Sequence, residues 1–173
     1  LHEAWRVATT GEPGPVFIEI PVNLQLFPGT IEEIPAWNPP TAEFPPIESS
    51  SLEQAASLLH EASHPALYVG WGARHAVAES TALAEMLGMP VATTLQGISA
   101  FPADHPLHAG FGFSRSATPP ARNAFQGCDC LLAVGARFGE IATGSFGVNI
   151  PKNLIHIDIN PAVFDANYPA RIK

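Results

Sequence analysis

Two apolar stretches in the last third of this chain each lead directly to a charged side chain. Residues 129–134 lead through Gly135 to Arg137, and residues 154–157 lead to Asp158. A guanidinium group at the end of a strand can pair with phosphate oxygens, and a carboxylate at the end of the next strand can accept hydrogen bonds from a ribose or an adenine. These positions therefore predict a nucleotide-binding edge.

Both charged positions also have simpler explanations. Arg137 can form a surface salt bridge. Asp158 can cap the short helix that Pro161 is well placed to open, although Asn160 is better placed as that cap. The local sequence leaves these alternatives open.

A third candidate is the turn Gly70-Trp71-Gly72-Ala73, between a predicted strand and a predicted helix. In that context glycines let a pyrophosphate approach backbone N–H groups at a helix N-terminus. The full fingerprint needs a third glycine, and His75 stands at that position. The segment therefore fits either a nucleotide-binding turn or a plain tight turn, and Trp71 fits either stacking on a flat ring or packing against a neighbouring domain.

The sequence predicts no catalytic residue. It contains no Gly-x-Ser-x-Gly elbow and no Walker loop. Ser114 and Ser116, on either side of Arg115, are interpreted as polar groups of a loop, and Asp104-His105 before Pro106 as a turn.

No metal site is predicted either. Cys128 and Cys130 lie two apart in a predicted strand, a spacing that disfavours a mutual disulfide and fits small buried side chains. His60 and His64 fall at a helix end, where imidazoles meet the helix dipole favourably. None of the histidines follows a zinc-ligand spacing.

The elements that must position these residues alternate between strands and helices. We expect strands over residues 15–21, 66–69, 90–94, 129–134 and 154–158, and helices over residues 2–9, 52–64, 76–87 and 120–125. Ser50 with Glu53 would cap the second helix, and Gly88 would close the third. Apolar strands separated by helices predict a doubly wound α/β domain whose mainly parallel sheet is covered on both faces. Its ligand edge would carry the loops after Val69, Thr94, Val134 and Asp158.

Composition narrows the class of protein. The 173 residues are 46% apolar, and 8 basic against 16 acidic residues give a formal charge of -8. An acidic chain without a basic cluster is a poor partner for nucleic acid. No apolar run is long enough to span a membrane, and no signal peptide begins the chain, so we expect a cytoplasmic protein.

Prolines divide the chain. Six of its 18 prolines crowd into residues 28–46, which predicts a linker between an N-terminal piece and everything after Ser49. The N-terminal piece and the missing initiator Met predict a segment of a longer polypeptide.

The ordered set of motifs resembles the middle region of thiamine diphosphate-dependent enzymes of the acetolactate synthase type. The resemblance extends over nearly the whole chain, in residues 14–21, 70–73, 90–97, 101–107, 110–112, 129–138 and 155–161. It implies the end of a pyrimidine-binding domain in residues 1–28, a Pro-rich linker in residues 29–48 and a central domain in residues 49–173.

The resemblance also implies partners and cofactors. The pyrimidine-binding and diphosphate-binding domains of the same polypeptide would hold thiamine diphosphate and Mg²⁺ mostly outside this chain, which has no Gly-Asp-Gly motif. The complete enzyme would be a homodimer or homotetramer that acts on 2-oxo acids as a carboligase or decarboxylase, and this segment alone would be inactive.

In flavin-containing members the central domain holds FAD, which performs no net redox chemistry there. The positions that match that site are Gly70, Trp71, Gly72, Thr94, Leu95, Gly110, Gly112, Gly135, Arg137 and Asp158. The chain departs from the family pattern at Gly139-Glu140-Ile141, where members close to acetolactate synthase have two aspartates and an arginine. Two further functions stay open: an autonomous adenine-nucleotide or flavin module, and a purely structural assembly domain.

Overall fold

The computed structural model of the protein describes residues 1–39, 46–112 and 115–173. These form two compact units, Leu1–Pro46 and Ile47–Lys173. Part of the predicted linker over residues 29–48 lies outside the described residues. Ser114 also lies outside them.

The first unit consists of two short helices joined by extended chain. Helix α1 spans His2–Thr9, as predicted, and α2 spans Val22–Leu26. None of the described residues of this unit is buried. The strand predicted over residues 15–21 is wrong: the chain is extended there, but no described residue pairs with it to form a ladder.

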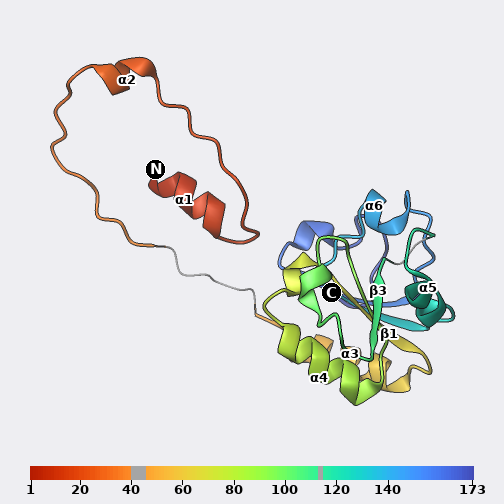
Figure 1. Ribbon diagram of the computed structural model, residues 1–173. Helices are drawn as coiled ribbons and strands as arrows, with labels where there is room; N and C mark the ends of the chain where they lie inside the picture. Colours follow the sequence, from red (N-terminus) through yellow and green to blue (C-terminus); the bar gives the residue numbers. More distant parts are fainter. Residues whose placement is uncertain (40–45, 113–114) are drawn as a thin grey trace. The chain divides into compact units, whose positions relative to one another are not determined.

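The second unit is built on a five-stranded, entirely parallel sheet (Figure 1). Its strands are β1 (Pro65–Val69), β2 (Val91–Thr93), β3 (His108–Phe111), β4 (Cys130–Val134) and β5 (Asn153–Ile157). Their order across the sheet is β3-β2-β1-β4-β5. The chain therefore winds outward in both directions from the β1–β4 pair, and the predicted doubly wound α/β fold is confirmed.

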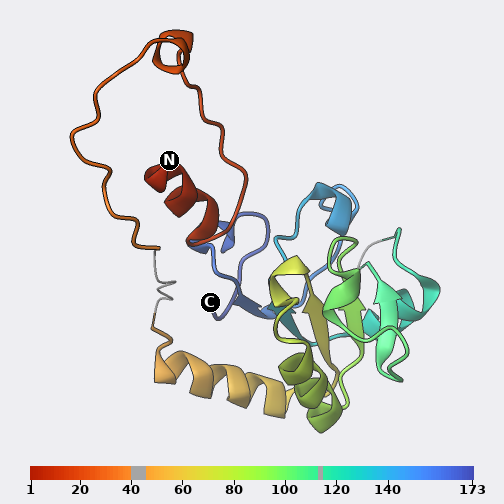
Figure 2. The same ribbon diagram turned by 60° about the vertical axis from the view of Figure 1, so that its left-hand side comes forward.

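Helices and short 3₁₀ turns connect the strands. The helices are α3 (Ser49–Glu61), α4 (Val77–Leu87), α5 (Pro119–Phe125) and α6 (Glu140–Thr143), and the 3₁₀ turns are η1 (Trp71–Ala73), η2 (Ile98–Ala100) and η3 (Pro161–Val163). Figure 2 shows α6, in blue, at the end of the sheet where the strands terminate.

The alternation of side chains along the strands creates two cores. Leu67 and Val69 of β1 face the core that contains Leu59 of α3 and Ala84 of α4. Tyr68, between them, points to the opposite face of the sheet and packs in the other core, which contains Ala121 and Phe125 of α5. Burial on both faces explains why the central strands are apolar throughout.

Three details differ from the sequence prediction. Helix α3 begins at Ser49 after Glu48, with no side-chain cap, so the capping box of Ser50 and Glu53 is wrong. The helix ends at Glu61, before the predicted end. Strand β3 was not anticipated, because it is a half-exposed edge strand that contains Gly110 and lacks the continuous apolar run of its neighbours.

Candidate functional site

The carboxyl ends of four strands are level with one another at one edge of the sheet. Val69 of β1 pairs in register with Thr93 and with Val134, and Val134 pairs with Ile157. The loops that follow these strands therefore start side by side. In doubly wound sheets ligands bind beyond the carboxyl ends of the strands, at the place where the connections from two adjacent strands run to opposite sides of the sheet. In this sheet that place lies between β1 and β4.

Three of the predicted glycines meet at that point, and we call Gly70, Gly72 and Gly135 the glycine junction. A Cβ added to Gly70 would lie 2.0 Å from the carbonyl oxygen of Gly135, and one added to Gly135 would lie 2.4 Å from the Cα of Gly72. Gly135 also has a left-handed φ of +60°. Glycine is needed here because two backbones touch and leave no room for side chains.

The backbone amides of the glycine junction bond within the domain. The N–H of Gly70 donates to the carbonyl of Val134 at 2.9 Å, and the N–H of Gly72 donates to the carbonyl of Gly135 at 3.3 Å. The N–H of Ala73 donates back to Gly70 at 3.0 Å. These donors hold β1 and β4 together at their ends, so a phosphate group at this edge would need other partners.

The two apolar candidates at this edge are exposed. Trp71, the first residue of η1, is 53% exposed, and Leu95, which precedes η2, is 54% exposed. The two turns contact each other. The guanidinium carbon of Arg74 lies 5.0 Å from the centre of the Trp71 ring. An exposed indole with a cation beside it offers a surface on which a flat ring can stack.

Thr94 serves the loop that carries Leu95. Its side chain is buried, and its hydroxyl oxygen accepts a hydrogen bond from the N–H of Gly97 at 2.9 Å. Its own N–H donates to the carbonyl of Val69 at 2.9 Å. Thr94 therefore closes a turn against the end of β1.

Gly110 and Gly112 bring β3 close to the segment before α5. Both have positive φ angles, +105° and +89°, and a Cβ on Gly110 would lie 2.3 Å from the hydroxyl oxygen of Thr118. That hydroxyl donates to the carbonyl of Ala109 at 2.9 Å. These glycines shape the sheet edge through close packing.

Arg137 is displayed by a short loop after β4, residues 135–138, which we call the arginine loop. Arg137 is exposed, whereas its neighbours Ala136 and Phe138 are 1% and 2% exposed. The N–H of Gly135 donates to the carbonyl of Ile157 at 2.8 Å and fixes the start of the loop to β5. Two buried anchors thus present one exposed cation at the ligand edge.

Phe138 holds the end of the arginine loop. Its φ of +50° is left-handed, which costs a bulky residue free energy and persists only where the surroundings enforce it. Its ring lies 5.8 Å from that of Tyr68, 5.3 Å from His156 and 5.7 Å from Tyr168. The side-chain amide of Asn167 donates to its carbonyl at 3.2 Å.

His156 is a residue of this site that the sequence analysis missed. Its Nε2 lies 2.8 Å from the carbonyl oxygen of Ala136, and its ring is 1% exposed. Burial lowers the pKa of His156 below its usual 6.5, although Asp158 and Asp165 act in the opposite direction. The available signal was a histidine in the middle of an otherwise apolar strand.

Asp158, the last predicted ligand, stands directly after β5 and is half-buried. Its Oδ1 accepts a hydrogen bond from the N–H of Asn160 at 2.9 Å. Asn160 in turn caps η3 by accepting from the N–H of Ala162 at 3.0 Å, which confirms that Asn160 is the better cap. Asp158 therefore shapes the turn that follows β5.

The two cysteines and the Asp104-His105 pair have structural roles. Burial raises the pKa of Cys128 to about 12 and that of Cys130 to about 11, so both thiols stay protonated. The predicted turn at Asp104-His105 is confirmed, since the N–H of His105 donates to Pro102 at 3.3 Å. Across residues 1–39, 46–112 and 115–173, no three His, Cys, Asp or Glu side chains gather as a metal site, and no helix is long and apolar enough to cross a membrane.

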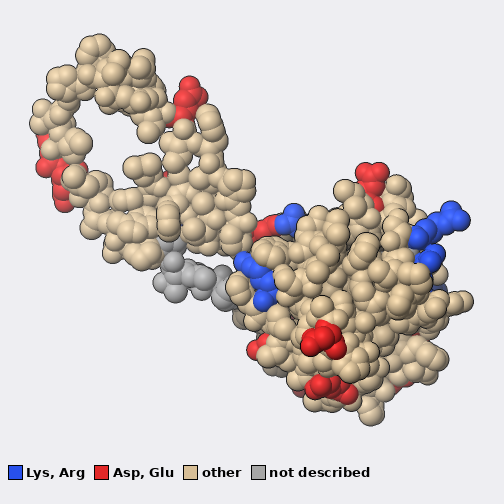
Figure 3. All heavy atoms as spheres, viewed as in Figure 1, with Lys and Arg blue, Asp and Glu red and all other residues tan. Residues whose placement is uncertain are grey.

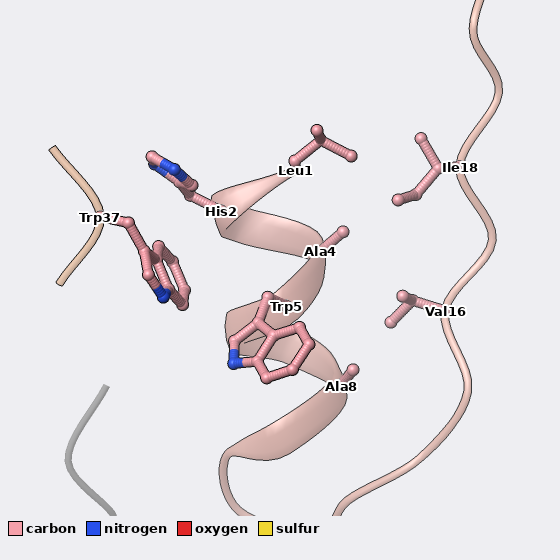
Figure 4. A pocket seen from close by; sticks show the side chains of 8 residues that line it. All are labelled: Leu1, His2, Ala4, Trp5, Ala8, Val16, Ile18 and Trp37. Atoms are coloured by element: carbon pink, nitrogen blue, oxygen red, sulfur yellow. The ribbon is translucent and has the colours of Figure 1, made fainter. Parts of the chain in front are cut away.

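The first unit has a pocket of its own, of about 330 Å³. Figure 4 shows Val16 and Ile18 pointing from the extended chain toward α1, with the rings of His2 and Trp5 close to Trp37 on the other side. The Trp5 and Trp37 ring centres lie 6.3 Å apart. Apart from the imidazole of His2, the side chains that line this pocket are apolar or aromatic and offer contact surface.

Charged side chains do not concentrate at one place on the visible face of the protein. Figure 3 shows Lys and Arg as well as Asp and Glu scattered singly or in small groups among uncharged residues. This face offers no basic surface for a polyanion.

Comparison with known sequences relates the second unit to one family. The family described as "Thiamine pyrophosphate enzyme, central domain" matches residues 52–173. This chain belongs to that family. The match begins in α3 and includes every predicted ligand residue from Gly70 to Asp158.

Individual relatives of this central domain extend the likeness to almost the whole chain. The acetolactate synthase large subunit of Corynebacterium glutamicum is 39% identical over 94% of the chain and 26% of its own length. The large subunit of acetolactate synthase isozyme 2 of Escherichia coli is 41% identical over 94% of the chain and 29% of its own length. A probable acetolactate synthase large subunit of Methanocaldococcus jannaschii is 37% identical over 99% and 30%. The chain thus spans less than a third of these relatives.

Proposed function

We propose that this chain is the central part of a thiamine diphosphate-dependent enzyme of the acetolactate synthase type, which acts on 2-oxo acids as a carboligase or decarboxylase. The family match and the relatives named acetolactate synthase support this proposal. The chain itself would be inactive.

Thiamine diphosphate and Mg²⁺ would be held mostly by residues outside this chain. The sequence has no Gly-Asp-Gly motif, and the described residues offer no cluster of metal ligands. The residues present therefore do not fit a metal–diphosphate site. We place the end of the pyrimidine-binding domain in residues 1–28 and the linker in residues 29–48, with the central domain in residues 49–173 and a homodimer or homotetramer as the complete assembly.

For the central domain itself we propose binding of an adenine nucleotide, such as FAD, at the carboxyl edge of the sheet. The observation that carries this proposal is the exposed residue Arg137 on a loop whose neighbours Ala136 and Phe138 are both buried. Arg137 would pair with phosphate oxygens, while Trp71 and Leu95 would contact a flat ring.

Calorimetric titration of the protein with ADP and with FAD tests this function. Wild-type protein should bind ADP with a dissociation constant of about 1 to 100 μM, and Arg137→Gln should weaken binding about tenfold by removing a charge-assisted hydrogen bond. Lys152→Gln, which makes the same charge change before β5 at the opposite edge, is the matched control and should bind as wild type. Absence of binding, or equal loss in both variants, would refute the nucleotide site.

A second candidate function is a purely structural domain, and the glycine junction favours it. Gly70 and Gly72 use their amides to join β1 to β4, which is a packing role that needs no ligand. Under this function neither ADP nor FAD binds, and Trp71→Ala in the complete enzyme leaves cofactor content unchanged but alters assembly, measured by sedimentation. A change in cofactor content would exclude it.

A further inference from the structure

His156 occupies the middle of β5 and reaches across to the loop that follows β4. The acceptor of its 2.8 Å hydrogen bond is the carbonyl oxygen of Ala136, and a carbonyl can only accept, so Nε2 carries the hydrogen. The ring is therefore fixed as the Nε2–H tautomer when it is neutral. Its partner, Ala136, is the residue directly before Arg137.

The packing around the imidazole holds it in this orientation. The ring meets Phe138 edge-on, with centres 5.3 Å apart and planes at 73°, and meets Phe164 edge-on at 5.2 Å and 80°. The remaining nitrogen, Nδ1, is buried and has no hydrogen-bond partner among the described residues. An apolar side chain would fill this position without an unpartnered nitrogen, so the bond to Ala136 is what the histidine adds.

Other contacts hold the two ends of the arginine loop. Gly135 is held by its N–H bond to Ile157, and Phe138 by its ring contacts and by Asn167. Between these ends, Ala136 packs in the core, and the bond from His156 holds its carbonyl oxygen. Loss of that bond would free the Ala136 carbonyl to turn while the ends of the loop stay attached.

We propose that His156 is a positioning residue, which fixes the carbonyl of Ala136 and thereby the direction in which the arginine loop presents Arg137 at the sheet edge. The effect on a ligand rests on the nucleotide-binding function proposed above. The effect on the loop does not, and this difference separates the two tests.

Limited trypsin digestion with mass spectrometry measures the loop directly, since trypsin cleaves after Arg137 only when the loop opens. The quantity is the rate of cleavage after Arg137 divided by that after Arg122 in α5. His156→Phe keeps a ring but removes the donor, and should raise this ratio about fivefold, the change that one ordinary hydrogen bond makes to a local opening equilibrium. His156→Gln, whose side-chain amide can donate to the same carbonyl, should restore a ratio within about twofold of wild type.

The control is Ile155→Ala, which removes buried side chain from the other core and lowers global stability. Global opening accelerates cleavage after Arg122 at least as much as cleavage after Arg137, so this variant should not raise the ratio. The proposal is overturned if His156→Phe leaves the ratio unchanged, or if His156→Gln raises it as much as His156→Phe does.

Titration with ADP gives the second readout. If wild-type protein binds ADP, His156→Phe should weaken binding about threefold to fivefold, because the lost hydrogen bond no longer holds Arg137 in position before ADP binds. His156→Gln should restore the wild-type affinity. If wild-type protein does not bind ADP, the proposed nucleotide function fails, and the cleavage ratio alone decides whether His156 positions the loop.

Discussion

Gly70→Ala should destabilise the second unit strongly. The backbone of Gly70 is extended, with φ of -106°, and alanine adopts that conformation freely, so the cost is steric. The new Cβ would lie 2.0 Å from the carbonyl oxygen, 2.7 Å from the carbonyl carbon of Gly135 and 2.9 Å from the Cα of Ala136. All three are backbone atoms that cannot rotate away, so β1 and β4 must separate at their ends.

That separation sets the size of the effect. Overpacking of a rigid core costs about 1 to 3 kcal/mol, and stretching the bond from Gly70 to Val134 and that from Gly72 to Gly135 adds about 1 kcal/mol each. We expect a loss of about 3 to 5 kcal/mol in the free energy of unfolding. For a unit of this size that lowers the melting temperature by about 10 to 20 °C.

Thermal and urea unfolding followed by far-ultraviolet circular dichroism measure the loss. The matched control is Gly139→Ala, since Gly139 also has a negative φ and nothing lies within 4 Å of its added Cβ. Alanine lowers the conformational entropy of the unfolded chain, which stabilises the protein, but it is a weaker helix N-cap than glycine. These two effects nearly cancel, so the free energy of unfolding should change by less than about 0.5 kcal/mol. If Gly70→Ala cost less than about 1 kcal/mol, the two backbones would not be in contact and the glycine junction would be wrong.

Three further predictions concern the core and its turns. Burial lowers the pKa of His156, so on acidification the unfolded chain protonates this histidine at a higher pH than the folded protein does. The free energy of unfolding should therefore fall as the pH drops below 6.5. In His156→Phe the urea midpoint should depend less on pH over this range. Met89→Ala, at a fully buried position, should cost about 2 to 5 kcal/mol in urea unfolding, and a cost below 1 would contradict its burial. Asp129→Ala should cost about 1 to 2 kcal/mol in the same assay, because its carboxylate accepts from the amides of Ser63 and His64 at 2.8 and 3.0 Å; an unchanged midpoint would show that these bonds contribute nothing.

Burial on both faces is what made most of the sheet predictable. Strands β1, β2, β4 and β5 are mostly apolar, and each was expected within one residue of its observed bounds. Strand β3 left no such signal because it is half-exposed and contains Gly110, whereas β5 at the opposite edge keeps a buried centre. The opposite error occurred at residues 15–21, where an apolar, proline-bounded run has no partner among the described residues. Pairing is a tertiary property that composition cannot supply.

The place of the candidate site was also predictable, but the contacts of its residues were not. The loops after β1 and β4 had to meet, because parallel strands end at one edge. Whether an amide in those loops faces a ligand or the neighbouring loop depends on the bonds from Gly70 to Val134 and from Gly72 to Gly135, which join residues far apart in sequence. For the same reason the bond from His156 to Ala136 could not be foreseen from a single histidine in a strand.

The glycine junction and the arginine loop are parts of one construction, because Gly135 belongs to both. Its carbonyl accepts from Gly72, its N–H donates to Ile157, and its left-handed backbone begins the turn that leads to Arg137. The hydrogen bonds that join the ends of β1 and β4 therefore also fix the start of the loop that carries Arg137. A nucleotide at this edge would be held at its phosphates by a side-chain charge instead of by a helix N-terminus. Its affinity should then fall steeply with added salt, because an exposed ion pair is screened whereas buried amide donors are not.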